Sequence, residues 1–378
     1  MNNVVIAGFA RSPFTPASKG ELARVRPDEL AAQVVKGLVA RTRVEPADVE
    51  DLIIGCAFPE GEQGLNLARI VGFIAELPIE VAGATVNRFC GSSMQAIHMA
   101  AGAIRMAAGE AFLCGGVESM TRVPMGGFNP MPHPKLAEDY PQAFISMGIT
   151  AENLARQYQI PRDAQEAFAL ASHQKATAAQ AAGTFADEIV PIAANGAAVD
   201  SDGCVRADTS REALAGLAPS FDKDGTVTAG TSAPLTDGAA AVLVCSEDYA
   251  KRKGLDVLAR IRSIALAGCP PETMGLGPVG AARKALERAG LGLEDIDVIE
   301  LNEAFAAQVL ACVQELDIEP DKLNVDGGAL ALGHPLGASG ARITGKAATL
   351  LKRNGAKFGL ATMCIGGGQG IATVLEAV

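Results

Sequence analysis

The chain has 378 residues, of which 49% are hydrophobic and 20% are charged, and Trp is absent. This composition is typical of a globular protein with a large core and excludes a disordered chain. The formal net charge of −11 argues against a nucleic-acid-binding protein, which needs a basic face. The sequence has no apolar run of about 18 residues and no signal-peptide pattern, so we expect a cytoplasmic protein without a membrane span.

Apolar strands and amphipathic helices alternate in the first third of the chain. Leu30, Val34 and Leu38 recur at helical spacing, and the apolar segments between the helices have the length of strands. The expected elements are a strand at 3–10, a helix at 27–42, a strand at 51–58, a helix at 93–109 and a strand at 111–116. Because these strands are apolar throughout, they indicate a sheet covered by helices on both faces, which is an α/β fold.

The character of the sequence changes after this alternating region. Residues 121–149 are rich in Pro, Gly and Met. Two helices are expected next, one with Thr150 as its N-cap and one running from Pro161 to Gly183. A polar stretch follows, so residues 121–232 are expected to form an inserted domain with its own small fold.

The second half of the sequence repeats landmarks of the first. "DLIIGC" matches "DVIELN", Cys90 matches His334 as a residue before a helix, and "LCGG" matches "MCIGGG", at offsets of 246, 244 and 250 residues. A nearly constant offset predicts a duplicated domain. The expected domains are residues 1–247, which include the insertion at about 121–232, and residues 255–378.

Cys90 is the first residue with an indication of chemistry. None of the eight cysteines forms a C-x-x-C pair, so a structural zinc site is not expected. Cys90 lies between a predicted strand and a predicted helix start, where the helix dipole is expected to lower the thiol pKa. Gly91 would let a substrate carbonyl approach. The alternative is a buried cysteine that packs a tight turn.

Three further stretches fit the same chemistry. His334 lies in the Gly-rich "GGALALGHPLGASGAR", where it could serve as a base for a thiol or cap a loop. Cys364 precedes "IGGGQG", and because a strand follows, the glycines do not predict a dinucleotide site. Asn302 and Glu303 follow an apolar strand, where they could enter a site or Asn302 could cap a helix. The residues alone therefore indicate a Cys/His acyl-transfer site on a duplicated α/β fold.

Taken together, these stretches resemble the thiolase family. "NRFCGSSMQA", "NEAFAAQ", "GGALALGHPLGASGAR" and "CIGGGQG" occur in the family's order, and "ARSPF", "SMGITAENLA" and "TAGTSAPLTDGAAA" also match. The resemblance implies a five-layered αβαβα fold from two similar halves, with a loop domain inserted in the first. It also implies a homodimer or homotetramer that transfers acyl groups between coenzyme A (CoA) thioesters, with CoA compounds as substrates and no further cofactor or metal.

The resemblance assigns a role to each catalytic position. Cys90 would take the acyl group as a thioester, and His334 would activate it and help bind the thioester oxygen. Cys364 would be the acid and base for the carbon atom of acetyl-CoA. Asn302 would hold a water in one oxyanion hole, and the N–H groups of Cys90 and Gly366 would form the other.

The resemblance also implies contacts with CoA in the loop domain. Arg206 matches a position near the adenine and phosphate end of CoA. Phe221, Ala229 and Ser232 match positions along the pantetheine arm, and Met147 matches a further CoA contact.

Two residues depart from common family patterns. Ser146 stands where short-chain biosynthetic members carry His, and Ala233 stands where many members have a Ser that contacts pantetheine. The first departure favours the degradative branch, which cleaves 3-oxoacyl-CoA in fatty-acid β-oxidation and can join a β-oxidation complex. The alternative is condensation of two acetyl-CoA molecules to acetoacetyl-CoA. The sequence does not indicate the preferred chain length.

Two other classes of protein fit these residues less well. A carrier-protein ketosynthase would use one Cys with two His, and only His334 lies in a suitable loop. An inactive scaffold on the same fold would not require Cys90, Asn302, His334 and Cys364 together.

Overall fold

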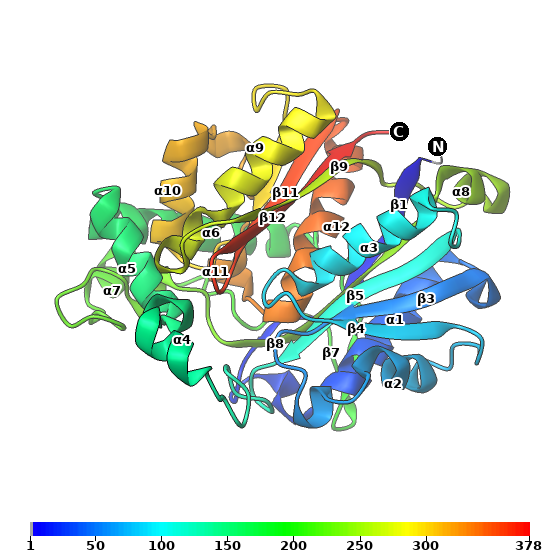
Figure 1. Cartoon of the computed structure of the whole chain (residues 1–378), viewed down its shortest axis with the longest axis horizontal. Helices are drawn as coiled ribbons and strands as arrows, with labels where there is room; N and C mark the ends of the chain where they lie inside the picture. The colour runs from blue at the N-terminus through cyan, green and yellow to red at the C-terminus, as the bar shows by residue number, and fades with distance from the viewer. Residues whose placement is uncertain (1–2) are drawn as a thin grey trace.

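A computed structural model describes residues 3–378 (Figure 1). Its strands fall into two sets that follow the two halves of the chain. The first set has the order β4-β3-β5-β8-β1 and the second the order β10-β11-β12-β9. The bounds are β1 (Val4–Arg11), β2 (Thr15–Pro16), β3 (Val49–Gly55), β4 (Ala82–Val86), β5 (Ala111–Ser119), β8 (Thr236–Ser246), β9 (Ala259–Gly268), β10 (Val298–Leu301), β11 (Phe358–Ile365) and β12 (Gln369–Glu376). Within the described residues, no helix is long and apolar enough to cross a membrane.

The two sets of strands have the same connectivity and the same directions. β3 runs parallel to β5 as β10 runs parallel to β11, and β8 and β12 follow as antiparallel neighbours. β1 and β9 then close each set, and a short pairing between them, Val5 with Arg260 and Ile6 with Ala259, joins both sets. The duplication predicted from the sequence offsets is therefore confirmed.

Helices form three layers around these two sets of strands. The outer helices of the first half are α1 (Pro27–Thr42) and α2 (Leu67–Ile74), and those of the second are α9 (Gly277–Ala289) and α10 (Ala306–Leu316). The middle layer consists of α3 (Ser92–Arg105) and α12 (Leu336–Asn354), which lie side by side at the centre of Figure 1. Their apolar side chains share one core with strands of both halves. The predicted αβαβα arrangement is confirmed.

A glycine allows the two central helices to approach each other. A Cβ atom on Gly340 would lie 2.5 Å from the backbone N of Met94, closer than real Cβ atoms come. The loops that precede α3 and α12 carry Cys90 and His334. The close packing of these helices therefore brings together residues from opposite halves of the sequence.

The inserted segment lies between β5 and β8. Its elements are α4 (Pro134–Asp139), α5 (Met147–Gln157), α6 (Arg162–Ala181), β6 (Ile192–Ala194), β7 (Ala197–Val199) and α7 (Arg211–Ala215). The prediction of Thr150 as an N-cap was wrong. Ser146 precedes α5 with extended backbone angles, and the Thr150 hydroxyl lies inside the helix and donates to the Met147 carbonyl at 2.6 Å. The remaining helices are α8 (Glu247–Lys253) and α11 (Ala329–Leu332).

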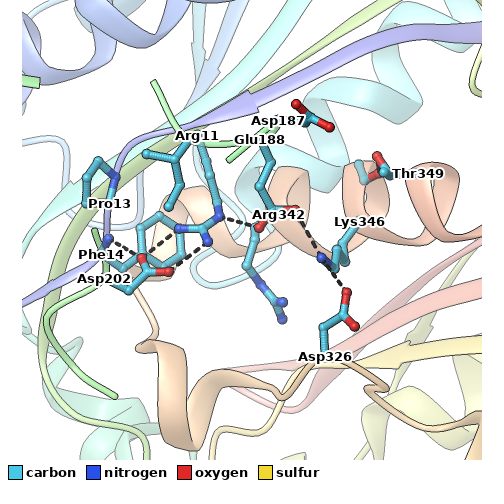
Figure 2. Close-up of polar contacts among 12 residues, drawn as sticks. Arg11, Pro13, Phe14, Asp187, Glu188, Asp202, Asp326, Arg342, Lys346 and Thr349 are labelled. Atoms are coloured by element: carbon cyan, nitrogen blue, oxygen red, sulfur yellow. Dashed lines mark hydrogen bonds and ion pairs between the residues drawn. The ribbon is translucent and has the colours of Figure 1, made fainter. Parts of the chain in front are cut away.

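A chain of buried ion pairs fixes the insertion to the core (Figure 2). Arg11 of β1 donates to Glu188 at 2.9 Å and to both oxygens of Asp202 at 2.7 and 2.8 Å. Lys346 of α12 lies 3.1 Å from Glu188 and 2.7 Å from Asp326. Because each of these charges has an opposite partner, their burial is tolerated. The chain connects the insertion to the helix that follows His334.

A buried histidine between the halves predicts a pH effect on stability. His98 of α3 contacts the Thr373 hydroxyl of β12 at 2.8 Å, and burial, followed by the charge of Arg88, lowers its pKa to about 3. The unfolded chain, with a His pKa of about 6.5, binds more protons below that pH, so stability falls as the pH drops from 6.5 towards 3.

We therefore expect His98→Gln to lose about 2 kcal/mol less stability than the wild type when the pH falls from 7 to 5. Urea unfolding at both pH values measures this difference. Equal acid sensitivity of His98→Gln and the wild type would contradict the prediction.

Candidate active site

Cys90 lies in a tight turn between β4 and α3. Phe89 adopts the left-handed conformation with φ of 43°, and the Ser92 hydroxyl donates to the Phe89 carbonyl at 2.5 Å. Gly91 caps α3, and a Cβ atom there would lie 2.5 Å from Ile365 at the end of β11. A glycine at this position therefore lets the cysteine turn pack against the strand that carries the second thiol.

The prediction of a lowered pKa for Cys90 was wrong. Burial raises the pKa of Cys90 to about 12, although the Gly366 N–H group bonds to the sulfur and opposes the shift. The first N–H groups of the α3 terminus do not reach the thiol, because those of Gly91 and Ser92 donate to the Arg88 and Phe89 carbonyls. The free thiol is thus protonated at neutral pH and needs a base.

His334 has the properties of that base. Its Nδ1 lies 2.6 Å from the Ser339 hydroxyl, whose own proton is donated to the Pro335 carbonyl at 3.1 Å. Nδ1 therefore carries the ring proton, and Nε2 is the acceptor that lies 3.4 Å from the Asn302 amide nitrogen. Burial, followed by the charge of Arg342, lowers the His334 pKa to about 3, so the ring is neutral.

Asn302 follows β10 and is fully buried. Its backbone N–H donates to the Thr362 carbonyl at 3.1 Å, and its side-chain Oδ1 has no partner among the described residues. The alternative that Asn302 caps a helix is excluded, because α10 begins at Ala306 with Phe305 as its N-cap. A buried acceptor without a partner is suited to a bound water or substrate group.

Glu303 has a structural role instead. Its carboxylate accepts from the Ser172 hydroxyl at 2.6 Å, the Asn324 amide at 2.8 Å and the Leu330 N–H at 3.2 Å. These contacts fix the segment that leads to His334.

Cys364 lies near the end of β11 and is buried. Burial, followed by the neighbouring charge of Cys90, raises its pKa well above the usual value, so the two sulfurs lie close enough to affect each other. The hairpin turn that follows contains Gly367 and Gly368 with φ of 78° and 81°, which side chains disfavour. This turn presents the Gly366 N–H group to Cys90.

Three of the predicted CoA contacts gather beside Cys364. Met147 packs in the apolar cluster that contains Phe305 and Cys364. The Phe221 ring meets the Phe305 ring edge-on at 5.8 Å between centroids, and Ser232 forms a β-bridge with Phe305. The three residues therefore each contact Phe305 or the apolar cluster that it shares with Cys364.

The other predicted CoA positions lie at the surface. Ala229 is exposed in a short 3-10 turn, and Ala233 is held by its N–H group on the Ala304 carbonyl. Arg206 is exposed and forms no ion pair within residues 3–378. Its backbone N–H donates to His173 Nδ1 at 3.1 Å. His173 lies in α6 and is buried.

Ser339, Thr236 and Glu118 support the site, although none of them was predicted to belong to it. Ser339 sets the His334 tautomer, and the Thr236 hydroxyl accepts the His334 N–H at 3.0 Å. Glu118 accepts from the N–H groups of Gly337 and Ala57 and so fixes the start of α12. Ser339 lies in the His334 motif and Thr236 in "TAGTSAPLTDGAAA", whereas Glu118 lies in none of the matching stretches.

Comparisons with known proteins cover the whole chain. The family models for the thiolase N-terminal and C-terminal domains match residues 4–248 and 255–377. A 3-ketoacyl-CoA thiolase of Bacillus subtilis (strain 168) is 46% identical over 389 residues, and one of Shewanella sp. (strain ANA-3) is 50% identical over 388 residues. Both alignments cover 100% of each chain.

Solved structures give the same picture. Human mitochondrial 3-ketoacyl-CoA thiolase, also solved in complex with CoA, is 39% identical with a TM-score of 0.93 and covers 100% of this chain and 98–99% of its own. The Bacillus anthracis acetyl-CoA acetyltransferase is 43% identical with a TM-score of 0.91, over 100% of this chain and 99% of its own.

Proposed function

Because the chain belongs to the thiolase family of acyltransferases, we propose that it cleaves 3-oxoacyl-CoA with CoA to acetyl-CoA and a shortened acyl-CoA. The observation that carries the proposal is that Cys90 affects the pKa of Cys364, while the Gly366 N–H group, two residues after Cys364, bonds to the Cys90 sulfur. The neutral His334 supplies the base that the protonated Cys90 requires. Relatives named 3-ketoacyl-CoA thiolase favour this reaction over acetoacetyl-CoA synthesis.

In the first half-reaction, the Cys90 sulfur attacks the 3-oxo carbon and its proton passes to His334 Nε2. The bond between C2 and C3 then breaks, and the acetyl-CoA carbanion takes a proton from Cys364. In the second half-reaction, the CoA thiol gives its proton to Cys364 and attacks the thioester. The Cys90 thiolate leaves and recovers its proton from His334, so both thiols are restored.

Two oxyanion holes follow from the geometry. We expect the Gly366 and Cys90 N–H groups, which both bond to the Cys90 sulfur, to stabilise the oxygen of the Cys90 thioester. Asn302 and His334 lie together, and the Asn302 Oδ1 without a partner is suited to a water that helps hold the other thioester oxygen. Each positioned donor of this type is worth about 10²–10³-fold in rate.

CoA would reach the thiols along the loop domain. We expect CoA to pass Phe221, Ser232 and Met147, which contact Phe305 or its apolar cluster with Cys364, and to pass the exposed Ala229. Arg206, exposed and without an ion-pair partner in residues 3–378, is free to meet a phosphate. The human relative solved with CoA supports this use of the fold.

The test of the function is CoA-dependent cleavage of 3-oxoacyl-CoA substrates from C4 to C16. The proposal expects cleavage of medium and long chains, with kcat/KM at C8 or above at least equal to that at C4. Activity confined to C4 would favour the acetoacetyl-CoA alternative. The oligomeric state, the cytoplasmic location and membership of a β-oxidation complex stay predictions.

A second experiment separates the roles of the two thiols. Cys364→Ala should still form an acyl-enzyme from a simple acyl-CoA, because that step needs only Cys90 and His334. Cleavage of 3-oxoacyl-CoA should fall by at least about 10²–10⁴-fold, because the carbanion loses its proton donor. Mass spectrometry and a thiolysis assay measure the two steps, and Cys90→Ala, which cannot be acylated, is the control. Loss of acylation in Cys364→Ala would contradict the division of roles.

A further inference from the structure

Arg88 connects the two halves of the active site through one side chain. Its Nε donates to the Gln95 side-chain oxygen on α3 at 2.8 Å. Its Nη1 donates to the Gln369 side-chain oxygen at the start of β12, also at 2.8 Å and 281 residues away in sequence. Both bonds carry the charge of the guanidinium, and charge-assisted bonds are the stronger kind.

On one side, Arg88 is part of the turn that holds Cys90. Its backbone N–H donates to the Ser92 hydroxyl at 2.8 Å, and its carbonyl accepts from the Gly91 N–H at 3.0 Å. The residue is thus fixed from its backbone to its guanidinium, two positions before the proposed nucleophile.

On the other side, Gln369 closes the hairpin turn that carries Gly366. Gln369 pairs with Ile365 across the hairpin, and the three residues between them are glycines. A glycine turn has no side chains of its own to position it, so its place depends on its ends. One end is held by the Cys269 N–H on the Gly368 carbonyl, and Gln369 supplies the contact with the N-terminal half.

We infer that Arg88 is a positioning residue that sets the Gly366 N–H group on the Cys90 sulfur by joining the two turns. The contact between the Gly366 N–H group and the Cys90 sulfur does not depend on which reaction the enzyme catalyses, whereas the expected effect on turnover rests on the proposed function. Lysine could not replace Arg88, because a single ammonium on a flexible stem lacks the fixed fork that reaches Gln95 and Gln369 at once. Arg88 is inferred to act through Gly366 and not on the reacting atoms themselves.

The direct test is the pH dependence of Cys90 alkylation by iodoacetamide, followed on the Cys90 peptide by mass spectrometry. It needs no substrate, so it tests the inference even if thiolysis is not the activity. Gln369→Leu and Arg88→Met should both lower the Cys90 alkylation rate at each pH from about 7 to 10, because the thiolate loses the Gly366 N–H group. Arg88→Met also removes a positive charge near the thiol, so Gln369→Leu is the decisive variant. Glu118, which acts on Cys90, and Cys364 and His334, the other titratable groups of the proposed site, are unchanged in both variants.

The effect on the rate of thiolysis can be tested by comparing a disruptive with a conservative substitution of Gln369. Gln369→Leu and Arg88→Met should lower kcat for thiolysis by about 10- to 100-fold, with KM for CoA nearly unchanged. Gln369→Glu keeps an acceptor for Arg88 and should stay within about threefold of the wild type. The double variant Arg88→Met/Gln369→Leu should be no slower than the slower single variant, because both substitutions remove the same contact between Arg88 and Gln369.

The variants are compared only where they are folded. Thermal midpoints establish that each variant is folded, and Gln369→Leu alone suffices if Arg88→Met does not fold. A wild-type alkylation profile in folded Gln369→Leu would overturn the inference. So would a loss of activity in Gln369→Glu equal to that in Gln369→Leu.

Discussion

Replacing Cys90 with alanine is expected to abolish thiolysis of 3-oxoacyl-CoA while leaving the fold intact. The sulfur is the atom to which the acyl group is transferred, and no other thiol in the described residues receives the Gly366 N–H group. Removal of a nucleophile in comparable enzymes costs about 10⁴- to 10⁶-fold in kcat, and we expect a loss in that range. Only a small side chain is lost from a turn that glycine and backbone bonds already define.

Thiolysis rates and circular dichroism measure the two parts of this expectation. Cys245→Ala is the control, because Cys245 is buried in β8 where it pairs with Ala111, at the opposite end of β5 from Glu118. It should keep the wild-type rate with a small loss of stability. A Cys90→Ala enzyme that turns over at more than about one hundredth of the wild-type rate would remove Cys90 from the mechanism.

The second large effect concerns stability. Lys346→Met should destabilise the protein by about 3 kcal/mol, because it removes one partner from a buried ion-pair chain. Lys346 is 3% exposed and contacts both Glu188 and Asp326. Burial alone would raise the pKa of Glu188, and Arg11 and Lys346 together hold it below its usual value. Without Lys346, Glu188 keeps only one of its two cations.

Lys352 offers a matched control in the same helix. It pairs with Asp256 at the surface, where both side chains are largely exposed, so Lys352→Met should cost less than about 1 kcal/mol. Urea unfolding followed by far-UV circular dichroism compares the two variants, since the chain has no Trp for fluorescence. Equal urea midpoints for Lys346→Met and Lys352→Met would show that the buried chain contributes nothing special.

The duplicated fold could be predicted because landmark residues repeat at a nearly constant offset. Helix periodicity also gave α1 its bounds, residues 27–42, which the structure reproduces. Cys90 and His334 each precede a helix of the central layer, as the repeated landmarks predicted. Local pattern and internal repetition therefore account for most of the architecture.

The protonation states could not be predicted in the same way. The pKa of Cys90 depends on burial by segments such as Ile365, which lies far away in the sequence. The helix dipole depends only on the local chain. The N–H groups of Gly91 and Ser92, which were expected to act on the thiol, donate to carbonyls within the turn instead. The hydrogen bond between Arg88 and Gln369 likewise joins residues that are 281 positions apart in sequence, and neither local motif predicts it.

The most direct test of the account is the location of the acyl group. The enzyme would be mixed with 3-oxooctanoyl-CoA in the absence of CoA, quenched rapidly in acid and digested for peptide mass spectrometry. We expect a hexanoyl group on the Cys90 peptide, together with one equivalent of acetyl-CoA. A hexanoyl group on another residue, or turnover in the presence of CoA without any acylated Cys90, would contradict the account.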